Sequence, residues 1–304
     1  MTETKNLLPH GETMQALIWR RFRKHPGAII GSIVLTLIIL AVALAGLSPY
    51  DPERSSMAER YQPPSMTHPM GTDALGRDLM TRVLYGGRIS LLVGLSVMMI
   101  TLLIGVPVGA IAGYFGGWVD NFLMRITDAA LSLPSLLVLI LLSAILREVD
   151  APFLKNNPVL TIASVIGLLA WMFTARLVRA SYLAIREMDY VTATRALGGS
   201  NLRIIALHIF PNAIGPVIVE GTLEVAYAIL EESGLSYLGF GIQPPTPSWG
   251  NLLSNAQEYL VKYPWLAIFP GIMIFLAVIS INYIGDGLRD AFDPYKVLKK
   301  IGEV

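Results

Sequence analysis

The sequence predicts an all-α integral membrane protein with six transmembrane helices. Of its 304 residues, 54% are hydrophobic and only 15% are charged, a balance far more apolar than that of soluble globular proteins. The apolar residues are also gathered into runs of about 17 to 25, the length of a helix that crosses the hydrocarbon core of a bilayer. The six runs cover residues 27–47, 89–114, 129–145, 158–173, 213–235 and 265–284.

The first run has the features of a retained membrane anchor. The small residues Ala43 and Ala45 imitate a signal-peptide cleavage site, but the run is longer than a usual signal-peptide core and its charged leader is long. We therefore expect a membrane domain at 27–285, preceded by an N-terminal segment at 1–26 and followed by a tail at 286–304.

The distribution of Lys and Arg predicts the orientation. If the N-terminus is cytoplasmic, 15 of the 23 basic residues fall in the cytoplasmic segments and eight in the external ones. Basic residues prefer the cytoplasmic side of a membrane. Both termini and the polar segment 186–212 are therefore predicted inside, and segment 48–88 outside.

Three glycines recur every four residues in the second run, at Gly105, Gly109 and Gly113. Such a ridge lets another helix approach closely in a bilayer, where packing drives association. We expect it to serve packing within this chain and draw no function from it.

The polar segment 186–212 interrupts the apolar pattern with a predicted helix–turn–helix. Helix-forming residues flank Gly198 and Gly199, which supply the backbone freedom of a sharp bend. A second amphipathic run follows, and Pro211 is expected to close the unit.

Three carboxylates share one face of the fifth run. Glu220, Glu224 and Glu231 fall within about 40° of each other at 100° per residue, whereas Glu232 lies off this stripe. Carboxylates are costly inside a bilayer, so the stripe is predicted to line an aqueous path. The alternatives are that it pairs with Lys or Arg of another chain or contacts a cationic cargo directly.

Several classes of chemistry have no support in the sequence. There is no cysteine, and the four histidines, His68 among them, are not spaced as metal ligands. No catalytic arrangement suited to an intramembrane protease occurs, and no Gly-x-x-x-x-Gly-Lys-Ser/Thr loop that would bind nucleotide. We expect no catalytic residue, metal or cofactor on this chain, and nothing points to nucleic acid.

Two external segments predict local structure. Gly71 and Gly76, with Asp73, Arg77 and Asp78, suit a compact turn with short-range ion pairs that leads into an interfacial helix. Residues 243–249, Gln-Pro-Pro-Thr-Pro-Ser-Trp, are too rich in proline for a helix and predict an ordered extended loop.

These segments also carry a resemblance to a known family. Residues 68–91, 238–250 and 282–294 resemble, in order, segments of the second ("C-type") permease subunit of dipeptide, oligopeptide and nickel ABC importers. The polar segment resembles the coupling loop of such permeases, in which a Glu-Ala-Ala triplet, a glycine and a proline keep fixed spacing. Residues 192–194, Gly198 and Pro211 keep that spacing, although the triplet, Thr-Ala-Thr, departs at two of three positions.

The resemblance implies the type I ABC importer permease fold and a role as half of an ATP-driven translocation path, with di- or oligopeptides as the expected cargo. Nickel, a nickel complex or glutathione is the alternative cargo, and a passive channel or secondary carrier the less favoured class. The implied partners are a homologous permease, two ATPase subunits that carry ATP and Mg, and an extracytoplasmic solute-binding protein, at the inner or plasma membrane of a prokaryote. The residues implied to couple to the ATPases are Asp189, Tyr190, Ala193, Thr194, Ala196, Gly198 and Pro211.

Overall fold

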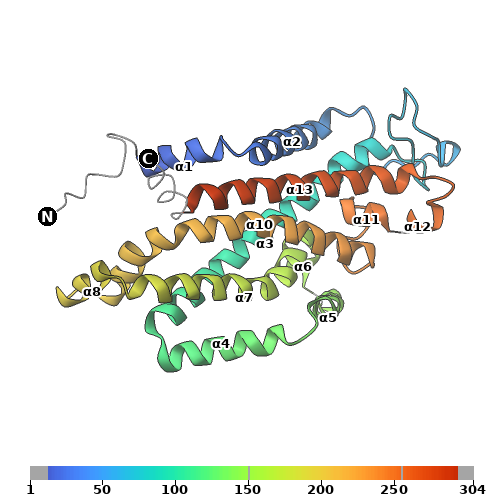
Figure 1. The fold of residues 1–304 in the computed structure, drawn as a ribbon. Helices are drawn as coiled ribbons and strands as arrows, with labels where there is room; N and C mark the ends of the chain where they lie inside the picture. The colour runs from blue at the N-terminus through green and yellow to red at the C-terminus, as the bar shows by residue number, and fades with distance from the viewer. Residues whose placement is uncertain (1–12, 150, 255, 294–304) are drawn as a thin grey trace.

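Five long helices lie side by side and form the body of the protein (Figure 1). The computed structural model describes residues 13–149, 151–254 and 256–293; these residues form helices and loops, with one isolated β-bridge between Thr72 and Asp78. Each of the five is long and apolar enough to cross a membrane. They are α2 (Pro26–Ala43), α3 (Leu79–Phe115), α7 (Pro158–Arg186), α10 (Phe210–Tyr237) and α13 (Trp265–Phe292).

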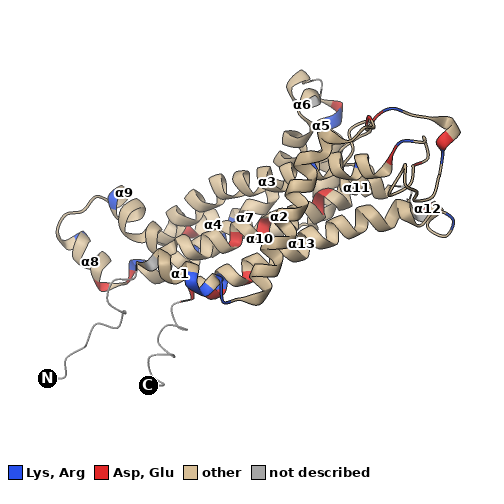
Figure 2. Ribbon diagram, turned by 90° about the horizontal axis from the view of Figure 1, so that it is seen from above, with Lys and Arg blue, Asp and Glu red and all other residues tan. Residues whose placement is uncertain are grey.

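Shorter helices connect them. The α-helical ones are α1 (Met14–Phe22), α4 (Gly117–Leu131), α5 (Ser135–Glu148), α6 (Pro152–Asn156), α8 (Asp189–Ala196), α9 (Asn201–Arg203), α11 (Trp249–Leu253) and α12 (Ala256–Tyr259). Two 3₁₀ turns, Leu44–Leu47 and Met57–Glu59, and a π-helical segment, Ile204–Ile209, complete them. Lys and Arg lie mainly at the two ends of the bundle (Figure 2).

The third predicted span is not one straight helix. The chain bends by 85° between α4 and α5, within the run 129–145 that we expected to cross the membrane. Pro134 lies at the bend, lacks a backbone N–H and disfavours the helical conformation for Leu133. The third predicted span is therefore present only if the bent pair of α4 and α5 is counted as one span, which would bring the total to six.

The second span starts earlier than the apolar pattern indicates, at Leu79. Asp78 caps α3: its carboxylate accepts hydrogen bonds from the backbone N–H (2.8 Å) and the hydroxyl (2.6 Å) of Thr81. The other oxygen of this buried carboxylate lies 2.9 Å from Nδ1 of His68. The turn therefore leads directly into the spanning helix, and residues 60–78, all of them described, form no separate interfacial helix before it.

The predicted turn itself is confirmed. Gly71 and Gly76 have φ of 77° and 71°, backbone conformations that residues with a side chain rarely adopt. A Cβ on Gly71 would also meet the Trp265 side chain at 2.9 Å. Arg77 donates from Nε to Asp73 at 2.7 Å, an ion pair within the turn. Residues 243–248 have no helix, as predicted, and the loop ends at the fully buried Trp249.

The glycine ridge packs α3 against α7. A Cβ on Gly105 would lie 2.8 Å from the Trp171 carbonyl oxygen, and one on Gly113 would lie 2.6 Å from Cβ of Tyr182. Such distances are shorter than real Cβ contacts, so only glycine allows the two helices to be this close. The interpretation of the ridge as packing within the chain is confirmed.

One end of the bundle carries the segments that we predict to be cytoplasmic. There α1 lies beside the end of α13, and α8 lies at the same end of the bundle but apart from them, opposite α11 and α12 (Figure 1). Arg21 of α1 donates to the carbonyl oxygen of Asp293 at 3.1 Å, at the end of α13. Because α13 continues to Phe292, residues 286–292, which we assigned to the tail, are helical; residues 294–304 lie outside the described ranges.

Candidate functional site

The turn after α8 is built around Gly198. Gly198 N–H donates to the Arg195 carbonyl (3.0 Å) and Gly199 N–H donates to the Thr194 carbonyl (3.0 Å), which is the hydrogen-bond pattern of a Schellman motif. This motif needs a left-handed residue at Gly198, whose φ is 83°. The predicted bend therefore has a defined geometry, with glycine where the backbone requires it.

Most of the predicted coupling residues are exposed on α8. Only Thr194 among them is partly covered, while the neighbouring Val191 is buried and anchors the helix. The exposed members are Asp189, Tyr190, Ala193, Ala196, Gly198 and Pro211. Leu197 and Leu202, beside them, expose 89% and 76% of their surface. This combination gives the end of the bundle a protruding surface with apolar side chains.

Pro211 does not close the unit, in contrast to our expectation. The chain is helical without a break from Asn201 to Tyr237, and Pro211 lies in the first turn of α10, directly after the π-helical segment. A change from i→i+5 to i→i+4 bonding at this point accommodates the missing N–H of proline. The second helical run of the predicted unit, which begins at Asn201, and the fifth span therefore form one continuous helical rod.

Polar contacts hold the start of this rod on α3 and α7. The hydroxyl of Tyr114, at the end of α3, donates to Oδ1 of Asn201 at 2.7 Å. The hydroxyl of Tyr182, in α7, donates to the Ile205 carbonyl at 3.3 Å, and the Arg195 guanidinium lies 5.7 Å from the Tyr114 ring centre. A displacement of α8 would therefore change contacts with α3 and α7 and the position of the helix that begins at Asn201.

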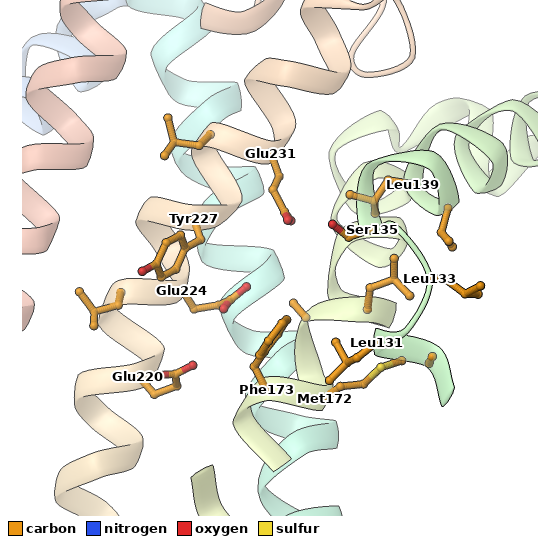
Figure 3. A pocket seen from close by; sticks show the side chains of 16 residues that line it. Leu131, Leu133, Ser135, Leu139, Met172, Phe173, Glu220, Glu224, Tyr227 and Glu231 are labelled. Atoms are coloured by element: carbon orange, nitrogen blue, oxygen red, sulfur yellow. The ribbon is translucent and has the colours of Figure 1, made fainter. Parts of the chain in front are cut away.

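Further along α10, the three predicted glutamates point into one cavity (Figure 3). Its volume is about 560 Å³, and its walls come from α10, α7 and the bend between α4 and α5. The lining residues are Ala130, Leu131, Leu133, Ser135, Val138, Leu139, Leu169, Ala170, Met172, Phe173, Glu220, Leu223, Glu224, Tyr227, Leu230 and Glu231. The structure thus brings the stripe together with an apolar wall contributed by other helices.

Glu232 has a different role from its neighbours. It is fully buried, and its carboxylate accepts hydrogen bonds from Ser90 of α3 (3.1 Å) and from Ser236 one turn later (2.6 Å). The Ser90 hydroxyl also accepts a hydrogen bond from the backbone N–H of Trp249 (3.2 Å), and the Ser236 hydroxyl accepts one from the backbone N–H of Ile242 (2.9 Å). Glu232 therefore holds the loop that follows α10 onto α3, a role that the sequence analysis missed.

Two ion pairs that the sequence analysis also missed hold one wall of the cavity. Arg179 of α7 donates to Asp120 of α4, with 2.6 Å between Nη2 and Oδ2, and Arg176 pairs with Asp128. Together they fix α4 along α7 up to the bend. Within the described ranges, no group of three or more metal-ligating side chains is arranged to hold an ion.

Comparison with known proteins decides the family. Residues 105–296 match the binding-protein-dependent transport system inner membrane component family, and residues 13–64 match the N-terminal transmembrane domain of oligopeptide transport permease C. The chain belongs to the family of binding-protein-dependent inner membrane transport components. It is therefore a multi-pass transport subunit of the inner membrane and not an enzyme.

Relatives of almost the same length support this assignment. A protein of Brucella abortus biovar 1 whose name describes a peptide transport system permease is 41% identical over 285 residues, 93% of each chain. The dipeptide transport system permease of Alkalihalophilus pseudofirmus is 40% identical over 279 residues, 91% of this permease and 88% of that chain.

The solved structure of the MetNI methionine ABC transporter in an inward-facing conformation has a similar fold. Its TM-score is 0.58 at 18% identity, covering 71% of this permease and 98% of that chain. At this identity the likeness concerns the fold, which is that of an ABC importer permease, as predicted.

Proposed function

We propose that this permease forms half of the translocation path of an ATP-driven peptide importer. The observation that carries the proposal is the continuous helix from Asn201 to Tyr237, which joins the exposed coupling surface at one end to the cavity that α10 forms with α7 and the bend between α4 and α5. Peptide as the cargo is supported by the relatives named as peptide and dipeptide permeases. Their names favour peptides over nickel.

ATP-driven import of a peptide would require partner subunits that supply what this chain lacks. A homologous permease would complete the path, and two ATPase subunits would supply ATP hydrolysis with Mg, since no phosphate-binding loop occurs in this sequence. An external solute-binding protein would deliver the cargo. The protruding surface of α8, with Tyr190 and Leu197, has the exposed apolar side chains that a docking helix needs.

The geometry suggests how the coupling would work. Closure of the ATPases on the nucleotide would displace α8, and the Schellman turn at Gly198 would pass this displacement to the rod that begins at Asn201. Because the rod is one helix, a tilt at its start also moves Glu220, Glu224 and Glu231 relative to α7. Rigid-body movement of this kind alternates the access of a central cavity in transporters.

The orientation is part of the proposal and can be tested separately. We place α8 and both termini in the cytoplasm, because 15 of the 23 Lys and Arg residues would then lie inside. In intact cells, a cysteine at residue 57 should react with a membrane-impermeant thiol reagent, whereas one at residue 200 should react only after permeabilisation. Reaction at residue 200 in sealed cells would reverse the orientation.

The transport activity is tested by reconstitution. Proteoliposomes that contain this permease with its partner permease, ATPases and binding protein should accumulate a radiolabelled dipeptide only when ATP is present on the ATPase side. The same assembly loaded with Ni²⁺ in place of peptide should show no accumulation of the metal. ATP-independent equilibration of peptide would instead favour a passive channel or carrier.

A further inference from the structure

We infer that the cavity on α10 binds a cationic group of the transported peptide, an ammonium or a guanidinium, and that Glu224 is its principal contact. This inference rests on the proposed function and names the chemistry that the path prefers. It makes this permease itself selective for charge, in addition to any selection by the binding protein.

Glu224 is the first observation that points to a ligand. Its side chain is directed into the cavity (Figure 3), and the residue is only 6% exposed. Within the described part of the chain, its carboxylate has no hydrogen bond or ion pair, in contrast to Glu232, which is fully buried and has two serine donors. A buried carboxylate is costly without a partner, so Glu224 is poised for one that is absent from this chain.

The charge of the cavity determines the sign of that partner. Glu220 and Glu231 add two more carboxylates, and the lining contains no Lys, Arg or His. Three carboxylates facing one cavity, with walls of low polarity, favour the entry of cations and disfavour that of anions. A cationic ligand would compensate this charge.

The spacing of the carboxylates favours a peptide over a single metal ion. Glu220 and Glu231 are separated by about 16 Å along the helix axis at 1.5 Å per residue, so the three groups do not converge on one ion. The same length matches about five residues of extended peptide, at about 3.3 Å each. A cationic group could move from one carboxylate to the next along this helix.

The rest of the cavity suits the apolar parts of a peptide. Leu131, Leu133, Met172 and Phe173 face α10 from the bend and from α7 (Figure 3). A mostly apolar pocket with a few convergent polar groups is the usual form of a site for a small organic ligand. Its volume of about 560 Å³ is adequate for a short peptide.

The first test measures charge preference in transport. In proteoliposomes with the complete assembly and saturating binding protein, uptake of Ala-Lys-Ala is compared with uptake of Ala-Ala-Ala, and Ala-Ala-Ala with its N-acetylated form. We expect Glu224→Gln to lower one of these cationic-to-neutral ratios about tenfold, the loss of one charge-assisted hydrogen bond. The first ratio reports a side-chain cation and the second the terminal ammonium.

Two variants serve as controls for this ratio. Glu224→Asp keeps the charge and should retain most of the preference. Glu148→Gln removes an exposed carboxylate at the end of α5, outside the cavity, and should leave both ratios unchanged. Ratios that stay the same in Glu224→Gln would overturn the inference.

A second measurement needs no cargo. Because the chain has no cysteine, Phe173→Cys places a single thiol on the wall opposite α10. A cationic thiosulfonate should react with it about tenfold faster than an anionic one of similar size, and adding Glu224→Gln should reduce this difference severalfold. Equal rates for the two reagents in the presence of all three glutamates would overturn the inference.

The outcomes separate this inference from its alternatives. If Glu224 instead pairs with Lys or Arg of the partner permease, Glu224→Gln should reduce recovery of the assembled complex and leave the uptake ratios unchanged, which would overturn it. Absence of any ATP-driven peptide uptake in the unmodified assembly would overturn the proposed function and this inference together. Peptide uptake with no charge preference would overturn this inference alone.

Discussion

Gly198→Pro should abolish ATP-driven uptake while the permease still inserts into the membrane in normal amount. Proline fixes φ near −65°, whereas Gly198 has φ of 83°, and proline also removes the N–H that donates to the Arg195 carbonyl. The Schellman turn cannot form with proline at this position. The coupling surface would then be misplaced relative to the helix that leads to the cavity.

The control is a residue that tolerates the left-handed conformation. A Cβ at Gly198 would meet no atom within 4 Å, so added volume is not the obstacle inside this chain, and Gly198→Asn should retain most of the uptake. Gly198→Trp should fold but interfere with ATPase docking, because its ring would lie on the exposed surface beside Leu197. Uptake rates are compared at equal amounts of membrane-inserted protein. Full uptake by a normally inserted Gly198→Pro protein would refute the coupling role of this turn.

The spans were predictable from the sequence because a bilayer selects for length and apolarity, which are properties of a local window. Whether such a run forms one straight helix or bends is not a property of length and apolarity. The run 129–145 satisfies the length rule, yet Pro134 in its middle bends the chain by 85°. Proline is tolerated inside other spans here, Pro107 in α3 and Pro270 in α13, so its presence alone did not predict the break.

The glutamate stripe was predictable for a similar reason. Glu220, Glu224 and Glu231 lie on one helix, and helical periodicity alone places them on one face. The opposite wall was not predictable, because Phe173 and Leu133 reach the cavity only through the packing of α7 and of the bend. No signal in the sequence links these positions to α10.

The contacts of Glu232 were predictable from the sequence only in part. Its contact with Ser236 is an i,i+4 pair that a closer examination of α10 could have found. Its contact with Ser90 joins positions 142 residues apart in the sequence, and only the tertiary fold shows it. A buried carboxylate with local hydroxyl partners is therefore a structural candidate, whereas one without them, such as Glu224, is a candidate for binding.

The glycine ridge supports a second large effect, this time on stability. Gly109→Leu should prevent α3 and α7 from packing, because even a Cβ at Gly109 would lie 2.8 Å from Cβ of Val178 and would also press against the Ala175 backbone. Overpacking of an interior typically costs about 1–3 kcal/mol, and this site belongs at the upper end because backbone, and not a flexible side chain, must move. We expect a large loss of monodisperse protein after detergent extraction and a lower unfolding temperature.

A glycine on α13 provides the matched control for this stability effect. A Cβ at Gly271 would meet no atom within 4 Å, so Gly271→Leu adds the same side chain to a spanning helix without a collision inside the chain. Leucine also has a better helix propensity than glycine by up to about 1 kcal/mol, so this variant should be extracted and should unfold like the unmodified permease. Equal unfolding temperatures for Gly109→Leu and Gly271→Leu would mean that the close contact of α3 and α7 does not limit the stability of the bundle. A selective loss in Gly109→Leu would show that the spacing of glycines along α3 sets the distance to α7, and with it the position of Phe173 opposite the glutamates.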